Sequence, residues 1–390
     1  MRSIAIALTA LIWGTTMLSA CSTVSDTVSS IFPQKDPNPP KALQAIQPSV
    51  NVQTLWQINT GSNTAKDYVR LYPYVDDTAI IVAGGGSVSA WNKRNGGLLW
   101  RTPISEEITA GVDGGDGLVL VGTTKGSAIA LDKQTGRIRW VEPLDSEVLS
   151  VSTATQGRVA FRTIDGKLNG LSTQTGETVW QQNRPTPVLS LRSAGVPVIV
   201  GDMVIAGFDN GTLTAFELQS GTGLWEALLS VPRGTNDLDK ITDVDGQIKV
   251  VGSGLFAAGY NGQIAGIDLR KGEIAWAKPF SSHAGVDANA DGLYATSETG
   301  DIWKIDPRSG TPAWKMDDLQ RRSPTAPLLL GRYIVVGDFE GYLHWINTET
   351  GRMVARSRSD TRGYTVPPIT DGRIVYSFGR GGVLSAYALQ

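Results

Sequence analysis

Cysteine and histidine are scarce in this 390-residue chain, which has one cysteine and two histidines. Cys21 has no second cysteine to pair with, so an intrachain disulfide framework is excluded. His283 and His344 stand singly, far apart in the sequence. A histidine-based zinc site or a Ser-His-Asp triad would therefore have to be assembled from very little. The sequence predicts no catalytic residue, no metal site and no cofactor.

Charge of one sign is also lacking. The 35 Lys and Arg residues nearly balance the 37 Asp and Glu residues, and the formal net charge is −2. This balance leaves no basic excess for a nucleic-acid partner. Residues 4–18 are mostly apolar, but they fall short of the roughly 20 residues that cross a bilayer, and no later apolar run is longer. We therefore expect no nucleic-acid binding and no membrane-spanning segment.

The amino-terminal segment has the order of a secretory signal: Arg2, the apolar residues 4–18, then small residues before Cys21. Leu18-Ser19-Ala20-Cys21 resembles a bacterial lipoprotein box, in which the cysteine is acylated and becomes the new amino terminus. The resemblance implies a signal peptide over residues 1–20 and a lipid on Cys21. Ser22, in place of an aspartate, implies sorting to the outer membrane, facing the periplasm. An ordinary signal peptide with a chance cysteine is the alternative.

Two further regions follow the cysteine. Residues 21–51 are rich in Ser, Thr and Pro and lack apolar periodicity, which is typical of a flexible tether. Residues 52–390 are too many for one ordinary compact core unless the chain is built from repeats. We therefore divide the chain into a signal peptide, a lipidated tether and one repetitive domain.

A repeat decides the expected fold. Its pattern is a glycine, an apolar residue two positions on, often a small residue four on, a large apolar residue five on, a glycine ten on and a tryptophan fourteen on. The leading glycines are Gly86, Gly126, Gly166, Gly211, Gly262, Gly300, Gly341 and Gly382. Their steps of 40, 40, 45, 51, 38, 41 and 41 residues each suffice for one four-stranded antiparallel sheet. The sequence therefore predicts an all-β, eight-bladed β-propeller.

Details of the repeat predict how the blades meet. Seven tryptophans fill the repeat position, and we expect them to pack between blades; in the seventh copy Ala355 replaces the tryptophan. Ala or Gly at position four should let a neighbouring sheet approach closely. The eighth copy stops before its outer strand, whereas residues 54–58 resemble an outer strand without a preceding motif. Pairing the two closes the ring and removes exposed edges; an open solenoid is the alternative.

One segment fits a calcium-loop pattern. Asp287, Asn289, Asp291, Gly292 and Glu298 match its spacing. The repeat register, however, makes residues 293–297 a strand. At about 3.3 Å per residue, Glu298 would then lie roughly 20 Å from Gly292 and could not fold back onto a metal. We interpret the segment as a turn.

The repeat resembles that of the quinoprotein dehydrogenases, whose propellers hold pyrroloquinoline quinone and calcium. This resemblance makes a dehydrogenase the enzyme alternative. Many of those enzymes stack an adjacent pair of cysteines on the quinone, and this chain has only Cys21. The likeness therefore concerns the scaffold, and fold likeness alone does not carry function.

Lipoprotein box, tether, eight blades and closure together resemble the β-propeller lipoproteins of the outer-membrane β-barrel assembly machinery. Segments 188–193 and 241–246 match the parts of that family that bind the periplasmic POTRA domains of the central barrel subunit. The resemblance implies a non-enzymatic scaffold that assists assembly and insertion of outer-membrane proteins. The implied contact residues are Leu189, Leu191, Arg192, Asp243 and Asp245.

The residues alone support a weaker form of this hypothesis. Both segments lie where the chain passes from the outer strand of one blade to the inner strand of the next, and hence on one rim. Leu189 to Arg192 beside an acidic pair combines apolar burial with opposite charges, as small protein interfaces do. Two alternatives stay open. Leu189 and Leu191 could begin a core strand, and the protein could be a chaperone that captures unfolded barrel strands by strand addition.

Overall fold

The computed structural model describes residues 38–62, 69–185, 195–230, 242–244 and 246–390. The chain divides into two compact units, residues 1–40 and residues 41–390, and the account below concerns the second. Its regular elements are all β-strands, arranged as eight four-stranded sheets. Over the described ranges, no helix is long and apolar enough to span a membrane.

Each sheet is one blade of a propeller, with its strands numbered from the axis outward. The strands of blades 1 and 2 are β2 (Tyr74–Val75), β3 (Ala79–Gly84), β4 (Ser87–Asn92), β5 (Leu98–Pro103), β6 (Ile108–Gly115), β7 (Leu118–Thr123), β8 (Ser127–Asp132) and β9 (Ile138–Pro143). Those of blades 3 and 4 are β10 (Val148–Val151), β11 (Arg158–Thr163), β12 (Lys167–Ser172), β13 (Thr178–Asn183), β14 (Val198–Val200), β15 (Met203–Gly207), β16 (Thr212–Glu217) and β17 (Gly223–Leu228).

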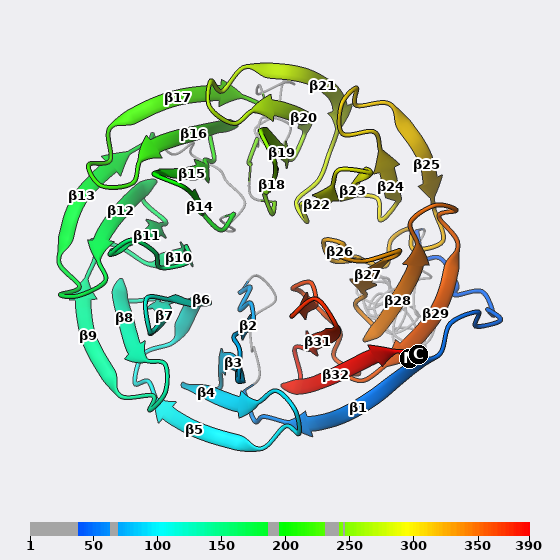
Figure 1. Ribbon diagram of the computed structural model, residues 1–390, viewed down its shortest axis with the longest axis horizontal. Helices are drawn as coiled ribbons and strands as arrows, with labels where there is room; N and C mark the ends of the chain where they lie inside the picture. Colours follow the sequence, from blue (N-terminus) through cyan, green and yellow to red (C-terminus); the bar gives the residue numbers. More distant parts are fainter. Residues whose placement is uncertain (1–37, 63–68, 186–194, 231–241, 245) are drawn as a thin grey trace, which may run out of the picture. The chain divides into compact units, whose positions relative to one another are not determined.

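The second half of the ring repeats this order. The strands of blades 5 and 6 are β18 (Lys249–Val251), β19 (Gly254–Ala258), β20 (Gly262–Asp268), β21 (Ile274–Phe280), β22 (Val286–Asn289), β23 (Gly292–Thr296), β24 (Ile302–Ile305) and β25 (Pro312–Met316). Those of blades 7 and 8 are β26 (Leu328–Leu330), β27 (Tyr333–Gly337), β28 (Tyr342–Asn347), β29 (Met353–Arg358), β30 (Ile369–Thr370), β31 (Ile374–Phe378), β32 (Val383–Leu389) and β1 (Val52–Asn59). The predicted eight-bladed propeller is confirmed (Figure 1).

The predicted closure is also found. Blade 8 takes three strands from the carboxyl-terminal end of the chain and its outer strand, β1, from the amino-terminal end. The two strands pair antiparallel, with Trp56 opposite Ala386. Figure 1 shows β1 in blue beside β32 in red. Because both ends lie in one blade, the sheets form a closed ring and not an open solenoid.

Burial follows from this arrangement. The second strand of a blade is covered on both faces by neighbouring blades, so all six residues of β3 and of β7 are buried. Outer strands alternate between exposed and half-buried residues, as β5 and β9 do. The core is therefore a series of apolar layers between blades, which explains why the second strands read as continuous apolar runs.

The repeat tryptophans join adjacent blades. Each lies on an outer strand and donates its indole N–H to a carbonyl in the turn between the third and outer strands of the next blade. The seven pairs are Trp56 to Lys93 (3.1 Å), Trp100 to Lys133 (3.0 Å), Trp140 to Thr173 (3.0 Å), Trp180 to Leu218 (2.9 Å), Trp225 to Leu269 (3.0 Å), Trp276 to Pro307 (2.9 Å) and Trp314 to Thr348 (3.0 Å). We call each such contact a tryptophan clip.

Glycines in the repeat make room for the indoles. A Cβ on Gly176, in the turn of blade 3, would lie 2.7 Å from a ring carbon of Trp140, and the φ of Gly176 is +81°. A Cβ on Gly170, on the strand opposite Trp180 of the same blade, would lie 2.0 Å from that ring. The small residue at position four of the repeat thus accommodates the tryptophan of its own blade. This differs from the expectation that it lets a neighbouring sheet approach.

Blade 7 reverses this pairing. Its third strand carries Trp345 where most blades have Ala or Gly, and its outer strand carries Ala355 opposite. Trp345 is fully buried and packs with Ala355 and Tyr387. The junction between blades 7 and 8 therefore has no tryptophan clip.

Residues 41–51, assigned from composition to the tether, lie against the propeller. The backbone N–H of Lys41 donates to Gln320 O (3.0 Å), and that of Ser49 donates to Val354 O (2.9 Å). The boundary at residue 51 is thus too late, and contact with the propeller begins at Lys41. Apolar periodicity missed this segment because Leu43 and Val50, which pack against the core, are widely spaced.

Candidate partner-binding surface

Four of the predicted contact residues, Leu189, Leu191, Arg192 and Asp245, lie outside the described residues, as does Cys21. The structure does describe Asp243 and the ends of both passages between blades. These ends define where the two passages begin and finish. We use them to locate the candidate surface.

The passage from blade 3 to blade 4 is fixed at both ends. Arg184 follows β13; its backbone N–H donates to Gly166 O (3.1 Å), and its guanidinium lies 5.3 Å from the ring centre of Phe216. At the other end, Ser150 Oγ donates to Gly195 O (3.1 Å). Residues 186–194 therefore connect two anchored points on blades 3 and 4.

The passage from blade 4 to blade 5 is anchored in the same way. Ser230 is buried beside Gly211, and Thr242 forms a parallel bridge with Asn210. Asp243 has 0% exposed surface, and its backbone carbonyl accepts a hydrogen bond from Tyr260 N (2.8 Å). The rim location is therefore as expected for Asp243, but its side chain is not at the surface. The turns of blades 4 and 5 that hold the passage cover it.

Both passages meet the same turn, residues 207–212 of blade 4. Arg162 of blade 3 forms a buried ion pair with Asp209 in this turn and lies 5.3 Å from the ring centre of Phe208. The next residue, Asn210, forms the bridge to Thr242 of the following passage. Because ion pairs inside a protein hold both partners in place, the turn fixes the described ends of the two passages relative to each other.

The axis of the propeller contains a cavity of about 530 Å³, lined by the innermost strands. Lys249 and Asp287 form an ion pair on its wall (2.7 Å). Burial raises the pKa of Asp113 to about 7, although the Gly114 N–H and Thr153 oppose the shift. Burial also raises the pKa of Tyr74, with Asp113 adding to the effect. The cavity therefore combines apolar walls with a few charged groups of both signs.

The residues of the calcium-loop pattern belong to a hairpin. Asp287 lies on β22, where it accepts the Leu329 N–H (2.7 Å) and pairs with Lys249. Asn289 Oδ1 accepts the Asp291 and Gly292 amides in the turn (2.9 and 3.0 Å). Across the part of the chain that the structure describes, no three His, Cys, Asp or Glu side chains are grouped to hold a metal ion.

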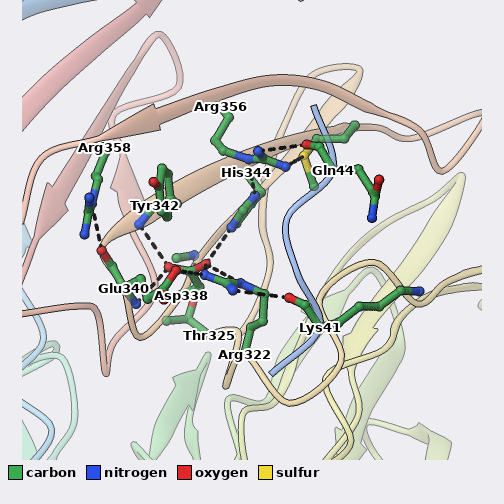
Figure 2. Close-up of polar contacts among 12 residues, drawn as sticks. Lys41, Gln44, Arg322, Thr325, Asp338, Glu340, Tyr342, His344, Arg356 and Arg358 are labelled. Carbon is green, nitrogen blue, oxygen red and sulfur yellow. Dashed lines mark hydrogen bonds and ion pairs between the residues drawn. The ribbon is translucent and has the colours of Figure 1, made fainter. Parts of the chain in front are cut away.

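A second polar cluster lies in blade 7 (Figure 2). Arg322 is buried and forms ion pairs with Asp338 (2.9 Å) and Glu340. Burial alone would lower the pKa of Arg322, but its bonds to Glu340 and Asp338 hold the pKa above its ordinary value. Sequence reasoning did not find this cluster, because its members are separated in the chain and follow no motif.

His344 belongs to this cluster and is fully buried, in contrast to the surface or rim position expected for it. Its Nε2 lies 2.9 Å from Asp338 Oδ2, and its Nδ1 accepts Arg356 Nε (3.3 Å). Burial lowers the pKa of His344 against the opposing effect of Asp338. A neutral imidazole that donates from Nε2 and accepts at Nδ1 satisfies both neighbours.

The geometry defines a class of protein: a closed eight-bladed propeller of tryptophan-clipped repeats with an anchored passage rim. A family profile described as "Outer membrane protein assembly factor BamB" matches residues 84–316 and 305–389. The outer membrane protein assembly factor BamB of Pseudomonas aeruginosa is 43% identical over 353 residues, 90% of this chain and 93% of that protein. The chain belongs to the BamB family.

Solved structures agree with this assignment. The crystal structure of BamB from Moraxella catarrhalis superposes with a TM-score of 0.80 at 27% identity, covering 87% of this chain and all of that chain. A europium-containing methanol dehydrogenase also superposes, with a TM-score of 0.64, over 86% of this chain and 93% of that chain. Its identity is 13%, so this second likeness shows the shared propeller fold alone.

Proposed function

We propose that this protein is a non-enzymatic scaffold in the assembly of outer-membrane proteins, and that it binds the periplasmic POTRA domains of the central barrel subunit. Membership of the BamB family, whose relatives are named outer membrane protein assembly factors, carries the proposal. No bond is made or broken in this role. The propeller holds a periplasmic arm of the barrel subunit while client proteins are inserted.

The proposed contact surface is the rim formed by the two passages. Leu189, Leu191 and Arg192 would supply apolar contact and a cation, as the central residues of interfaces commonly do. Asp245 would supply the opposite charge. For Asp243, burial favours a positioning role: it lies beneath the second passage, whose ends are anchored to blades 4 and 5.

Charge reversal tests this surface. Leu191→Asp and Arg192→Glu should each abolish or strongly weaken co-purification with the barrel subunit, while thermal melts stay unchanged. Arg352→Glu is the matched control, because Arg352 is an exposed arginine in the turn between β28 and β29 of blade 7. It should bind normally. Unchanged binding in both rim variants would remove this surface from the proposal.

The two aspartates should behave differently from each other. Asp245→Ala should weaken binding without lowering the melting temperature. Asp243→Ala should lower the melting temperature as well, since a buried hydrogen-bonding group is removed. If Asp243→Ala changes binding alone, Asp243 contacts the partner directly, and the positioning role is contradicted.

The proposal includes a lipid on Cys21 that holds the protein to the periplasmic face of the outer membrane. Cys21→Ser should release the protein into the soluble periplasm or leave it unprocessed. The comparison is made in cells without the barrel subunit, so that partner binding cannot retain it. Continued outer-membrane fractionation of Cys21→Ser there would contradict the lipid anchor.

A chaperone that binds unfolded barrel strands directly is a second candidate. The observation in its favour is that outer strands expose apolar side chains, including Leu98 (53%) and Val141 (52%). Such edges can accept an added strand. Leu98→Lys and Val141→Lys should leave barrel-subunit binding intact; if they abolish cross-linking to unfolded clients, the chaperone role is supported.

A further inference from the structure

The junction between blades 7 and 8 cannot be closed by a tryptophan clip. A clip needs the turn between the third and outer strands of the next blade. In blade 8 these strands are β32 and β1, which come from opposite ends of the chain. There is thus no connecting turn to present a carbonyl and a glycine. Ala355 stands where the other blades have tryptophan, and the bulky residue of the pair, Trp345, is on the inner strand.

Residues 41–50, here called the strap, lie at this junction instead. Val50 packs with the cluster that contains Val354, Ala355 and Trp345. Next to Val50, the Ser49 N–H donates to Val354 O on β29 (2.9 Å). The strap therefore contacts blade 7 at the position where a clip would begin.

Two contacts join the following residue, Asn51, to the last residue of blade 8. The Gln390 N–H donates to Asn51 O (3.0 Å), and Asn51 Nδ2 donates to Gln390 Oε1 (2.8 Å). These bonds bring the two chain segments together where other blades have a covalent turn. The strap thus leads directly from blade 7 into the closing strand of blade 8.

The other end of the strap is held on blades 6 and 7. Lys41 Nζ forms an ion pair with Asp317 (2.8 Å), at the end of blade 6. Leu43 packs against an apolar cluster that includes Met316 of blade 6 and Ile346 of blade 7. These contacts are well separated along the chain from those of Val50, so the strap spans three consecutive blades.

Two arginines bind the backbone of the strap. Arg322 Nη1 donates to Lys41 O (3.3 Å), and Arg356 Nη1 donates to Gln44 O (3.1 Å). Figure 2 shows both guanidiniums directed at the strap. Arg322 is held rigidly by Asp338 and Glu340, so little side-chain entropy is lost on making the contact. Recognition is thus mainly of an extended main chain, with apolar sockets at Leu43 and Val50.

We infer that the strap is the clip of the eighth junction and that it bears load applied through the tether before the closing strand β1 does. The first part rests on the structure alone. The second part rests on the proposed lipid anchor, since a tether fixed to a membrane would pull on Lys41. Force entering at residue 41 is transferred to blades 6 and 7, and the pairing of β1 with β32 is protected.

The clip is tested by paired substitutions in the full chain. Leu43→Ser with Val50→Ser removes both apolar contacts; Ala42→Ser with Gln47→Ser, at exposed positions of the same strap, is the control. The first pair should lower the melting temperature by a few degrees and raise amide exchange in β29 and β32 about tenfold, but not in β8 or β12. Equal effects of the two pairs, or exchange raised equally in all blades, would overturn the clip.

Load bearing is tested by pulling single molecules between the thiol of Cys21 and the carboxyl terminus. The strap should detach first, lengthening the chain by about 35 Å for its ten residues at 3.3 to 3.6 Å each, before the ring opens. The Leu43→Ser, Val50→Ser pair should lose this first step. Ring opening in one step in the unsubstituted chain would contradict load bearing. Because the unlipidated thiol is the handle, this result does not depend on whether the lipid anchor exists.

Discussion

Trp345 on β28 lies directly opposite Ala355 on β29, which is the reverse of Ala130 and Trp140 in blade 2. In blade 2 the indole faces outward and reaches the next blade, where Thr173 O accepts its N–H. In blade 7 the indole is fully buried within the core. The two tryptophan positions therefore have different energetic roles, although both stabilise packing between blades.

The indole hydrogen bond should separate these roles. Trp314→Phe removes a bond of 3.0 Å to Thr348 O, whereas the Trp345 nitrogen has no hydrogen-bond partner within the described ranges. We expect Trp314→Phe to cost about 1 kcal/mol more in the free energy of unfolding than Trp345→Phe. Equilibrium denaturation in urea measures both. Equal losses would show that the clips act through apolar contact alone.

A turn glycine beneath an indole should be less replaceable than one in open space. Gly176→Ala and Gly201→Ala both place a side chain at positive φ (+81° and +61°), which costs about 1–2 kcal/mol. Only at Gly176 would the new Cβ also meet the Trp140 ring, at 2.7 Å, while nothing lies within 4 Å at Gly201. We expect an extra loss of about 1–3 kcal/mol for Gly176→Ala, measured by denaturation. Equal losses would mean that the blades shift apart freely.

Closure should depend on β1 and not on the chain that precedes the strap. Deleting residues 52–59 removes the outer strand of blade 8 and Trp56, and loss of a large buried aromatic alone costs about 3–5 kcal/mol. Deleting residues 23–40 leaves every contact of the strap and propeller given above. Thermal melts of the two deletions should therefore differ widely. Matching melting temperatures would contradict closure by β1.

Stability should fall as the pH drops below about 6.5, where the His344 imidazole ordinarily titrates. Burial lowers the pKa of His344 in the folded chain, so below that pH the unfolded chain binds the proton more readily and gains stability relative to the folded chain. A proton on Nδ1 would also face the Arg356 guanidinium and disturb its bond to Gln44 O.

The loss of melting temperature between pH 7.5 and pH 5.5 should therefore be smaller in His344→Gln than in the unsubstituted chain. His283 is half-buried in a loop and serves as the control, through His283→Gln. An unchanged pH dependence in His344→Gln would show that His344 does not titrate in this range.

Much of the fold could be read from the sequence because the repeat is local. Glycines, small residues and tryptophans at fixed spacing specify each blade without reference to distant parts of the chain. The match between residues 54–58 and the incomplete eighth copy predicted the closing pair, since strands with unpaired edges favour pairing. Ala355 in place of tryptophan was visible as well, but its reason was not.

Only the tertiary structure gave that reason. Trp345, Ala355 and Val50 are brought together because blade 8 is built from both ends of the chain, a relationship that no spacing encodes. Burial of Asp243 and His344 was likewise decided by neighbouring blades covering them. The sequence by itself determined the number, order and closure of the blades, because these follow from local periodicity. The strap, the buried charges around Arg322 and the position of Asp243 depend on contacts between residues far apart in the chain, which form only when the ring is complete.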